Sequence, residues 1–254
     1  MNLNNQEIID LLEDKYDKFN RMSFIDSDPI SVPHLFLRKE DIEIAGFLAA
    51  TIAWGQRITI IKNANKLVQL MDLAPYDFVL NHTTKDLKRF EQFKHRTFNA
   101  VDVAFFITSL KNIYTTRGGL EQVFAAYSTD MQKSIHHFRE VFFEIDHPER
   151  TKKHVSDPFN NSAAKRINMF LRWMVRNDNR GVDFGLWKSI DPKYLMCPLD
   201  VHSGNVARKL DLLKRTQNDW KSTEELTEQL RRFDANDPVK YDFSLFGLGV
   251  FEKF

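Results

Sequence analysis

The fold is decided by the stretch SAAKRINMFLRWMVR (residues 162–176), whose periodicity recurs along most of the chain. At about 100° per residue, one face of the predicted helix holds Lys165, Met169, Arg172 and Arg176. The opposite face holds Ile167, Phe170, Leu171 and Met174. We therefore expect the helix to dock by its apolar face, to point Lys165 and the two arginines outward, and to be capped by Asn161 or Ser162.

Nine further segments show helical periodicity, and none shows a convincing strand alternation. The sequence thus predicts an all-α fold of roughly ten to twelve helices in one two-lobed unit over residues 1–254. A charged loop bounded by prolines marks a possible lobe boundary near 146–160, and the N-terminal segment can return to the second lobe. The nine segments are 6–19, 41–54, 57–71, 101–114, 120–127, 133–145, 200–212, 222–233 and 238–248.

Composition narrows the class of protein. The 254 residues are 43% hydrophobic and 28% charged, as in ordinary globular proteins, and 22 Phe against 9 Gly predict an aromatic core with short loops. The single cysteine, Cys197, excludes a disulfide framework and any Cys-ligated zinc or iron–sulfur site. The acidic start is unlike a signal peptide, and the longest apolar stretch, Ala45–Trp54, is too short to span a bilayer. We expect a cytoplasmic monomer with no membrane partner, no metal and no cofactor.

Charge is distributed unevenly although the net charge is only +1. Residues 1–50 hold five Lys and Arg against ten Asp and Glu, whereas residues 150–180 hold eight against two. Like charges on one helix stripe repel unless an acid four residues away relieves them, and here the acids lie outside the predicted helix. This favours an anionic partner such as a phosphate backbone, with a solvated helix face as the alternative.

Asp200 stands where a helix N-cap belongs, which by itself is a structural role. Its context, PLDVHSGNVARKLDLL (residues 198–213), resembles the stretch that carries the catalytic aspartate in the helix-hairpin-helix DNA glycosylase superfamily. Lys165 precedes Asp200 by 35 residues, an interval similar to that of the archaeal GO (8-oxoguanine) glycosylase branch. The glycine-rich hairpin of the superfamily is missing before Asp200, where Ser189–Leu195 stands instead.

Two further segments carry the same resemblance. DFSLF (residues 242–246) looks like the pair with which such enzymes hold and stack an extruded base, and WGQR (residues 54–57) resembles their glutamine-bearing segment. The stretches at 165–176 and 237–250 also look like an uncharacterised bacterial family of about this length.

The resemblance implies a two-lobed, glycosylase-like helical fold with a central cleft, acting on damaged duplex DNA. Base excision of an oxidised purine, 8-oxoguanine first, would be accompanied by abasic-site lyase activity. Lys165 would attack C1′ of the flipped nucleotide as a neutral amine, and Asp200 would stabilise the positive charge on the sugar. The base would be bound by Phe246, Asp242, Gln56, Trp54 and Met169. The DNA would be bound by Arg166, Arg172, Arg176, His202 and Arg208.

Other functions remain compatible with the sequence. One is a non-catalytic DNA- or RNA-binding helical protein that retains the fold. Another is a metal-dependent hydrolase of the all-α histidine–aspartate type, although the eight His include no His-Asp pair and no His-Glu-x-x-His. The last is an interaction scaffold that uses its wide helical surface.

Overall fold

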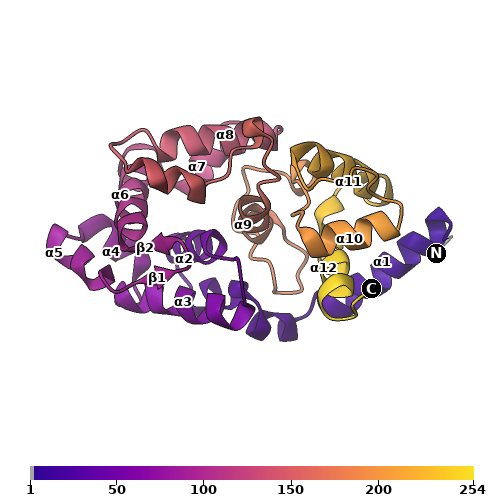
Figure 1. Ribbon diagram of the computed structural model, residues 1–254, viewed down its shortest axis with the longest axis horizontal. Coiled ribbons are helices and arrows are strands. Elements are labelled where there is room, and N and C mark those ends of the chain that lie inside the picture. Colours follow the sequence, from indigo (N-terminus) through magenta and orange to yellow (C-terminus); the bar gives the residue numbers. More distant parts are fainter. Residues whose placement is uncertain (1–2) are drawn as a thin grey trace. The chain divides into compact units, whose positions relative to one another are not determined.

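A computed structural model describes residues 3–254, and its helices are drawn in Figure 1. Helices take up 64% of the structure and strands 2%, which confirms the all-α class. The chain divides into two compact units. The first unit contains residues 3–24, 129–132 and 157–254, so the N-terminal helix packs with the C-terminal third, and the second contains residues 25–128 and 133–156.

The second unit has an aromatic core, as the 22 Phe predicted. Phe47 stacks on Phe106 with ring centroids 5.7 Å apart and meets Phe138 and Phe142 edge-on. Offset and edge-to-face arrangements of this kind add to the free energy of burial. Its helices are α2 (Lys39–Thr51), α3 (Arg57–Leu70), α4 (Pro75–Asn81), α5 (Thr84–Leu87), α6 (Ala100–Thr116), α7 (Leu120–Ala125) and α8 (Met131–Phe142).

The helical periodicity of the sequence did not predict several short elements. Helices α4 and α5 are too brief to show an apolar repeat, but Pro75 opens the first and a Thr83–Asp86 capping box opens the second. Strands β1 (Lys94–His95) and β2 (Phe98–Asn99) form an antiparallel hairpin in a stretch for which the periodicity predicted no helix. Short 3₁₀ helices occupy Met22–Ser27, Pro29–Ser31 and Pro33–Leu35 ahead of α2.

The first unit is built around α12 (Asp242–Val250), which packs against α1 (Asn5–Phe19) and α10 (Val201–Lys209). Ser244 Oγ donates a 2.6 Å hydrogen bond to the Leu12 carbonyl and so fixes α12 on α1. Leu12, Leu245 and Leu248 share one buried apolar cluster. Helices α9 (Lys165–Val175) and α11 (Trp220–Phe233) complete the unit.

Helix α9 differs from its prediction in two ways. It begins at Lys165, after Ala164 in the left-handed conformation, because Ser162 is held in a bridge to Asp219 instead of capping the helix. Residues 167–175 are all buried, so the helix is covered on every face. The prediction that this helix is amphipathic, with one basic stripe facing solvent, is therefore wrong.

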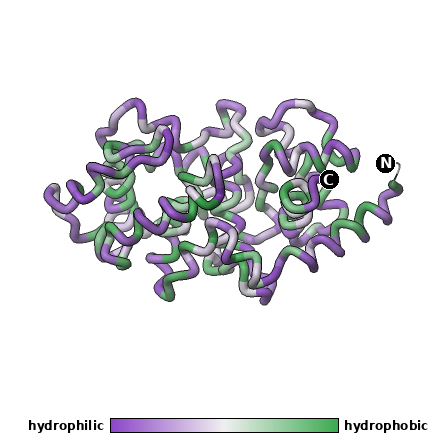
Figure 2. Tube along the Cα trace, turned by 60° about the horizontal axis from the view of Figure 1, so that its bottom comes forward, coloured by the Kyte–Doolittle hydropathy of each residue, from purple (hydrophilic) through white to green (hydrophobic). Residues whose placement is uncertain are grey.

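Along the trace, hydrophobic and hydrophilic stretches alternate within the helices of each unit (Figure 2). Within residues 3–254, no helix combines the length and the hydropathy that crossing a bilayer requires.

Gly247 allows the close packing of α12 on α1, because a Cβ added there would lie 2.1 Å from the Phe19 ring. We expect Gly247→Ala to lower the free energy of unfolding by about 1–3 kcal/mol, the usual cost of overpacking. Urea denaturation measures this change. In a Phe19→Ala background the same substitution should cost much less, since the clashing ring is gone. An equal cost in both backgrounds would contradict this packing.

Candidate functional site

The ends of two helices bring Lys165 and Asp200 together. Lys165 is the first residue of α9 and Asp200 is the N-cap of α10. The Lys165 Nζ atom lies 3.5 Å from Asp200 Oδ2, and each side chain keeps 26% of its surface exposed. The two groups that the sequence placed 35 residues apart therefore meet, and both remain reachable from solvent.

The two oxygens of Asp200 have different tasks. Oδ1 accepts the backbone N–H groups of His202 (2.8 Å) and Ser203 (3.0 Å), which confirms the predicted N-cap, while Oδ2 faces Lys165. Burial alone raises the pKa of this carboxyl, but the charge of Lys165 and the two backbone N–H groups outweigh it. The pKa of Asp200 thus lies below its ordinary value, and the carboxylate stays ionised at neutral pH.

A second carboxylate, Asp242, belongs to the same neighbourhood. It opens α12, is 6% exposed, and accepts a 2.5 Å hydrogen bond on Oδ2 from Arg172 Nη1. Burial raises its pKa to about 6 against the opposing charges of Arg172 and Lys165, and the charge of Asp200 adds to the rise. Two nearby carboxyls thus have pKa values displaced in opposite directions, a pattern found at acid–base sites.

Cys197 completes what we call the Lys165 cluster: Lys165, Asp200, Asp242, Arg172 and Cys197. Its thiol is fully buried and interacts electrostatically with Asp242, Arg172 and Asp200, and burial followed by the charge of Asp242 raises its pKa well above the ordinary value. Met169 is also buried, and its Sδ lies 3.8 Å from Lys165 Nζ. The amine thus has an uncharged thioether and the Asp200 carboxylate as neighbours.

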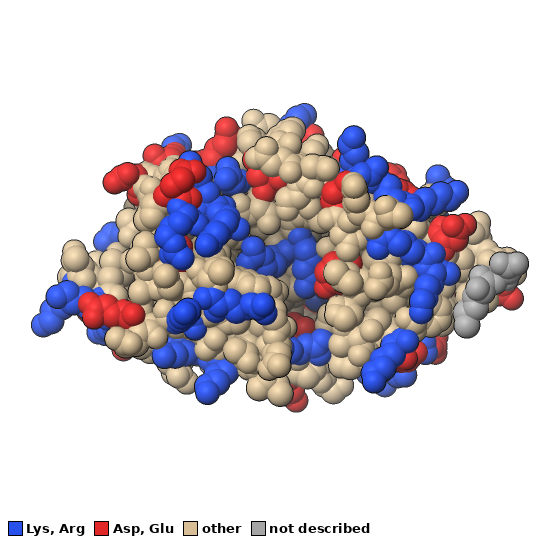
Figure 3. All heavy atoms as spheres, in the orientation of Figure 1, with Lys and Arg blue, Asp and Glu red and all other residues tan. Residues whose placement is uncertain are grey.

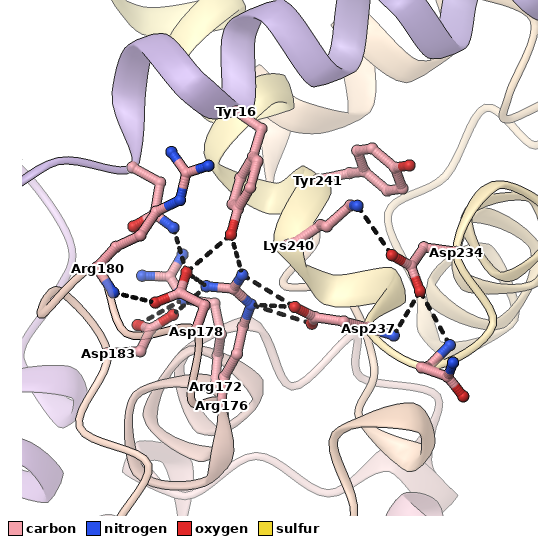
Figure 4. Close-up of polar contacts among 12 residues, drawn as sticks. Tyr16, Arg172, Arg176, Asp178, Arg180, Asp183, Asp234, Asp237, Lys240 and Tyr241 are labelled. Atoms are coloured by element: carbon pink, nitrogen blue, oxygen red, sulfur yellow. Dashed lines mark hydrogen bonds and ion pairs between the residues drawn. The ribbon is translucent and has the colours of Figure 1, made fainter.

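The predicted outward direction of Arg172 and Arg176 is wrong. Arg172 is 4% exposed and donates from Nε to Asp183 (3.2 Å) as well as from Nη1 to Asp242. Arg176 is fully buried, and its guanidinium group contacts Tyr16, Asp183 and Asp237 (Figure 4). Because carboxylates from later in the chain compensate both guanidinium groups, neither arginine is available to a DNA phosphate.

The other predicted DNA contacts differ in accessibility. His202 is exposed, whereas the Arg208 guanidinium is committed to the Arg215 and Gln217 carbonyls and to Asn218. Arg166 is partly buried, and burial lowers its pKa to about 10. On the face drawn in Figure 3, Lys and Arg occur in separate groups with Asp and Glu among them.

The predicted base-binding residues fall in both units. Phe246 is partly exposed on α12, where it meets the Phe24 and Phe251 rings edge-on at 6.1 Å. Trp54 and Gln56 belong to the second unit, between α2 and α3.

The Trp54 ring contacts two imidazole rings. It meets His95 edge-on at 5.0 Å and stacks on His154 at 6.0 Å. His95 is buried, with Asn63 Nδ2 2.8 Å from its Nδ1 and the Trp54 carbonyl 3.1 Å from its Nε2. Burial lowers the pKa of His95, so the ring is neutral and supports Trp54. The sequence did not reveal this role, because strands of two residues, such as those that carry His95, show no period.

No group of three or more His, Cys, Asp or Glu side chains in residues 3–254 is arranged to hold a metal ion. The partners that sequence reasoning missed are Asp183 and Asp237, which pair with α9 arginines. The available signal was the apolar surroundings of those arginines in residues 167–175.

Arg176→Met should lower the free energy of unfolding by about 3–5 kcal/mol, because it leaves buried carboxylates without their countercharge. Urea denaturation gives this quantity. Arg180→Met is the matched control: Arg180 is only partly buried and pairs with the exposed Asp17, so about 0–1 kcal/mol is expected. Similar losses for the two variants would refute the assignment of Arg176 as the buried centre of the network.

The comparison with known proteins identifies the family of this chain but assigns no function to it. No curated protein matches the chain significantly, and no solved structure does so either. One family model, described as "Protein of unknown function (DUF2400)", matches residues 28–251. That match includes α9, α10 and α12 and therefore the whole Lys165 cluster. The chain belongs to the DUF2400 family.

Proposed function

We propose that this protein is a DNA glycosylase of cytoplasmic base-excision repair that removes an oxidised purine, 8-oxoguanine first, and then acts as an abasic-site lyase. The observation that carries the proposal is the 3.5 Å approach of Lys165 Nζ to Asp200 Oδ2 at the ends of two helices. An amine and a carboxylate this close can act on one sugar carbon at the same time.

Asp200 would stabilise the positive charge that builds up on the sugar as the N-glycosidic bond breaks. A group aimed at developing charge is effective when it is already ionised and fixed. Both conditions are supported by its lowered pKa and by the two backbone N–H groups that hold Oδ1. The remaining oxygen, Oδ2, would be the one that faces the sugar.

Lys165 would be the nucleophile. A neutral amine that attacks C1′ displaces the base and leads to a Schiff base, from which β-elimination cleaves the strand. Met169 beside the amine offers no competing charge, and the exposed part of the Lys165 side chain leaves a route for substrate.

The base and the backbone would be held by residues around this pair. Phe246 supplies a partly exposed ring on α12, the same helix that presents Asp242. Considered by itself, the second unit offers another aromatic stacking surface for a base, because two imidazoles support the Trp54 ring. His202, exposed beside Asp200, is the strongest of the proposed backbone contacts.

The proposal predicts that borohydride will trap a covalent complex between the protein and a duplex that contains 8-oxoguanine or an abasic site. Lys165→Gln should abolish the adduct, because an amide cannot form a Schiff base. Denaturing gel electrophoresis and peptide mass spectrometry would show the adduct and its position. Lys193→Gln, which removes an exposed lysine paired with Asp191, should leave the yield unchanged. An adduct in Lys165→Gln would place the nucleophile elsewhere.

Asp200→Asn should retain the helix cap, since Asn is as good an N-cap as Asp. It should slow base excision by about 10²–10³-fold, the usual loss when a preorganised electrostatic group is removed. Single-turnover excision measured on the same duplex tests this. Binding of lesion and undamaged DNA with equal affinity and no product would instead favour a non-catalytic nucleic-acid-binding protein.

A further inference from the structure

We propose that Asp242 is the proton carrier of this site: it takes the proton from the Lys165 ammonium group and delivers it to the departing base. The inference rests on the proposed function for its substrate, and it gives Asp242 a role beyond hydrogen bonding to the base. It follows from the way the two carboxylates of the Lys165 cluster are held.

The two carboxylates differ in which oxygen accepts hydrogen bonds from the rest of the protein. In Asp200 the fold engages Oδ1 through the start of α10, and Oδ2 faces Lys165. In Asp242 the hydrogen bond from Arg172 is made to Oδ2. Arg172 is itself fixed by Asp183 at 3.2 Å. Asp242 therefore holds a fixed orientation, and the proposal assigns Oδ1 as the oxygen that receives the proton.

The pKa values of Asp200 and Asp242 suit the two carboxyl groups to different roles. Asp200 has a lowered pKa and suits the permanent negative charge that the sugar cation needs. Burial raises the pKa of Asp242 to about 6, so the group can both take up and release a proton near neutral pH, as a general acid–base group must. Lys165 interacts electrostatically with both, so proton transfer needs only direct contact or one bridging water.

The surroundings of Asp242 come from several elements. Helix α9 contributes Lys165 and Arg172, the N-cap of α10 contributes Asp200, and Cys197 contributes an un-ionised thiol. The ionisable groups of α1 and of the segment before α12 are engaged elsewhere. Glu13 pairs with Tyr241 and Lys240, Asp234 with Lys240, and Tyr16 with Asp178 and Arg176.

The proton and the electron pairs balance in this step. The Lys165 ammonium group gives one proton to the Asp242 carboxylate and becomes a neutral amine. Its nitrogen forms a bond to C1′ as the bond from C1′ to the base breaks, and the base leaves with that electron pair. Asp242 then protonates the base nitrogen and returns to its carboxylate form, so no oxidant, reductant or metal is needed.

Single-turnover excision of 8-oxoguanine from a duplex, followed between pH 5 and pH 8, tests the proposal. Since the carboxylate is the active form, the wild-type rate should fall as pH drops through about 6. Asp242→Asn still accepts the Arg172 hydrogen bond but cannot carry the proton. We expect it to be about 100-fold slower or more, and to lose the acidic limb of the profile. It should fold, because Asp183 still supplies a countercharge to Arg172 and the asparagine still accepts its hydrogen bond.

Asp237→Asn is the matched control, because Asp237 is a partly buried carboxyl that pairs with Arg176, outside the Lys165 cluster. It should keep the acidic limb and most of the rate. A full rate in Asp242→Asn, or a reduced rate with an unchanged acidic limb, would overturn the proposal, since the second result would show only a structural role.

A measurement without DNA separates this inference from the proposed function. Carbon-13 NMR titration of Asp242 should give a midpoint near pH 6 in the wild type. Lys165→Met removes a positive charge and should move the midpoint up, whereas Asp200→Asn removes a negative charge and should move it down. An unmoved midpoint in both variants would refute the proton link. Inactivity on lesion DNA with both shifts present would refute the glycosylase function alone.

Discussion

The first unit depends on the compensation of two buried guanidinium groups. Arg172, in the last turn of α9, and Arg176, its C-cap, lie at a depth where an unpaired charge costs several kcal/mol. Asp183, Asp237 and Asp242 supply the opposite charge from three places later in the chain. Burial alone lowers the pKa of Arg176, yet Asp183 and Asp237 outweigh it and hold the pKa above its ordinary value. The folded chain must therefore close around α9 before these charges are satisfied.

This network also shapes the candidate site. Arg172 has Asp183 on one side and Asp242 on the other, so the same guanidinium that anchors the core orients a carboxylate of the Lys165 cluster. Rigid support of this kind is what functional groups need, because a small misplacement weakens catalysis strongly. The proposed chemistry thus takes place at the accessible edge of a structural network, where Lys165 and Asp200 are each 26% exposed.

The sequence by itself determined much of the helical class and the local role of Asp200. Periodicity marked the long helices, and composition anticipated the Phe47, Phe106 and Phe142 core. Asp200 was recognisable as an N-cap because capping depends on residues only two or three positions away. Short elements such as α4, α5 and the β1–β2 hairpin were missed, since a few residues carry no period.

Only the tertiary structure decided which charges are solvated. A helical wheel gives the direction of Arg172 and Arg176 around α9, but it cannot show that Asp183 and Asp237 cover that face. The meeting of Lys165 with Asp200 and the raised pKa of Asp242 likewise arise from segments that are distant in the chain. Burial and charge pairing are properties of the packed unit, so the local pattern predicted the helices and the packing determined their chemistry.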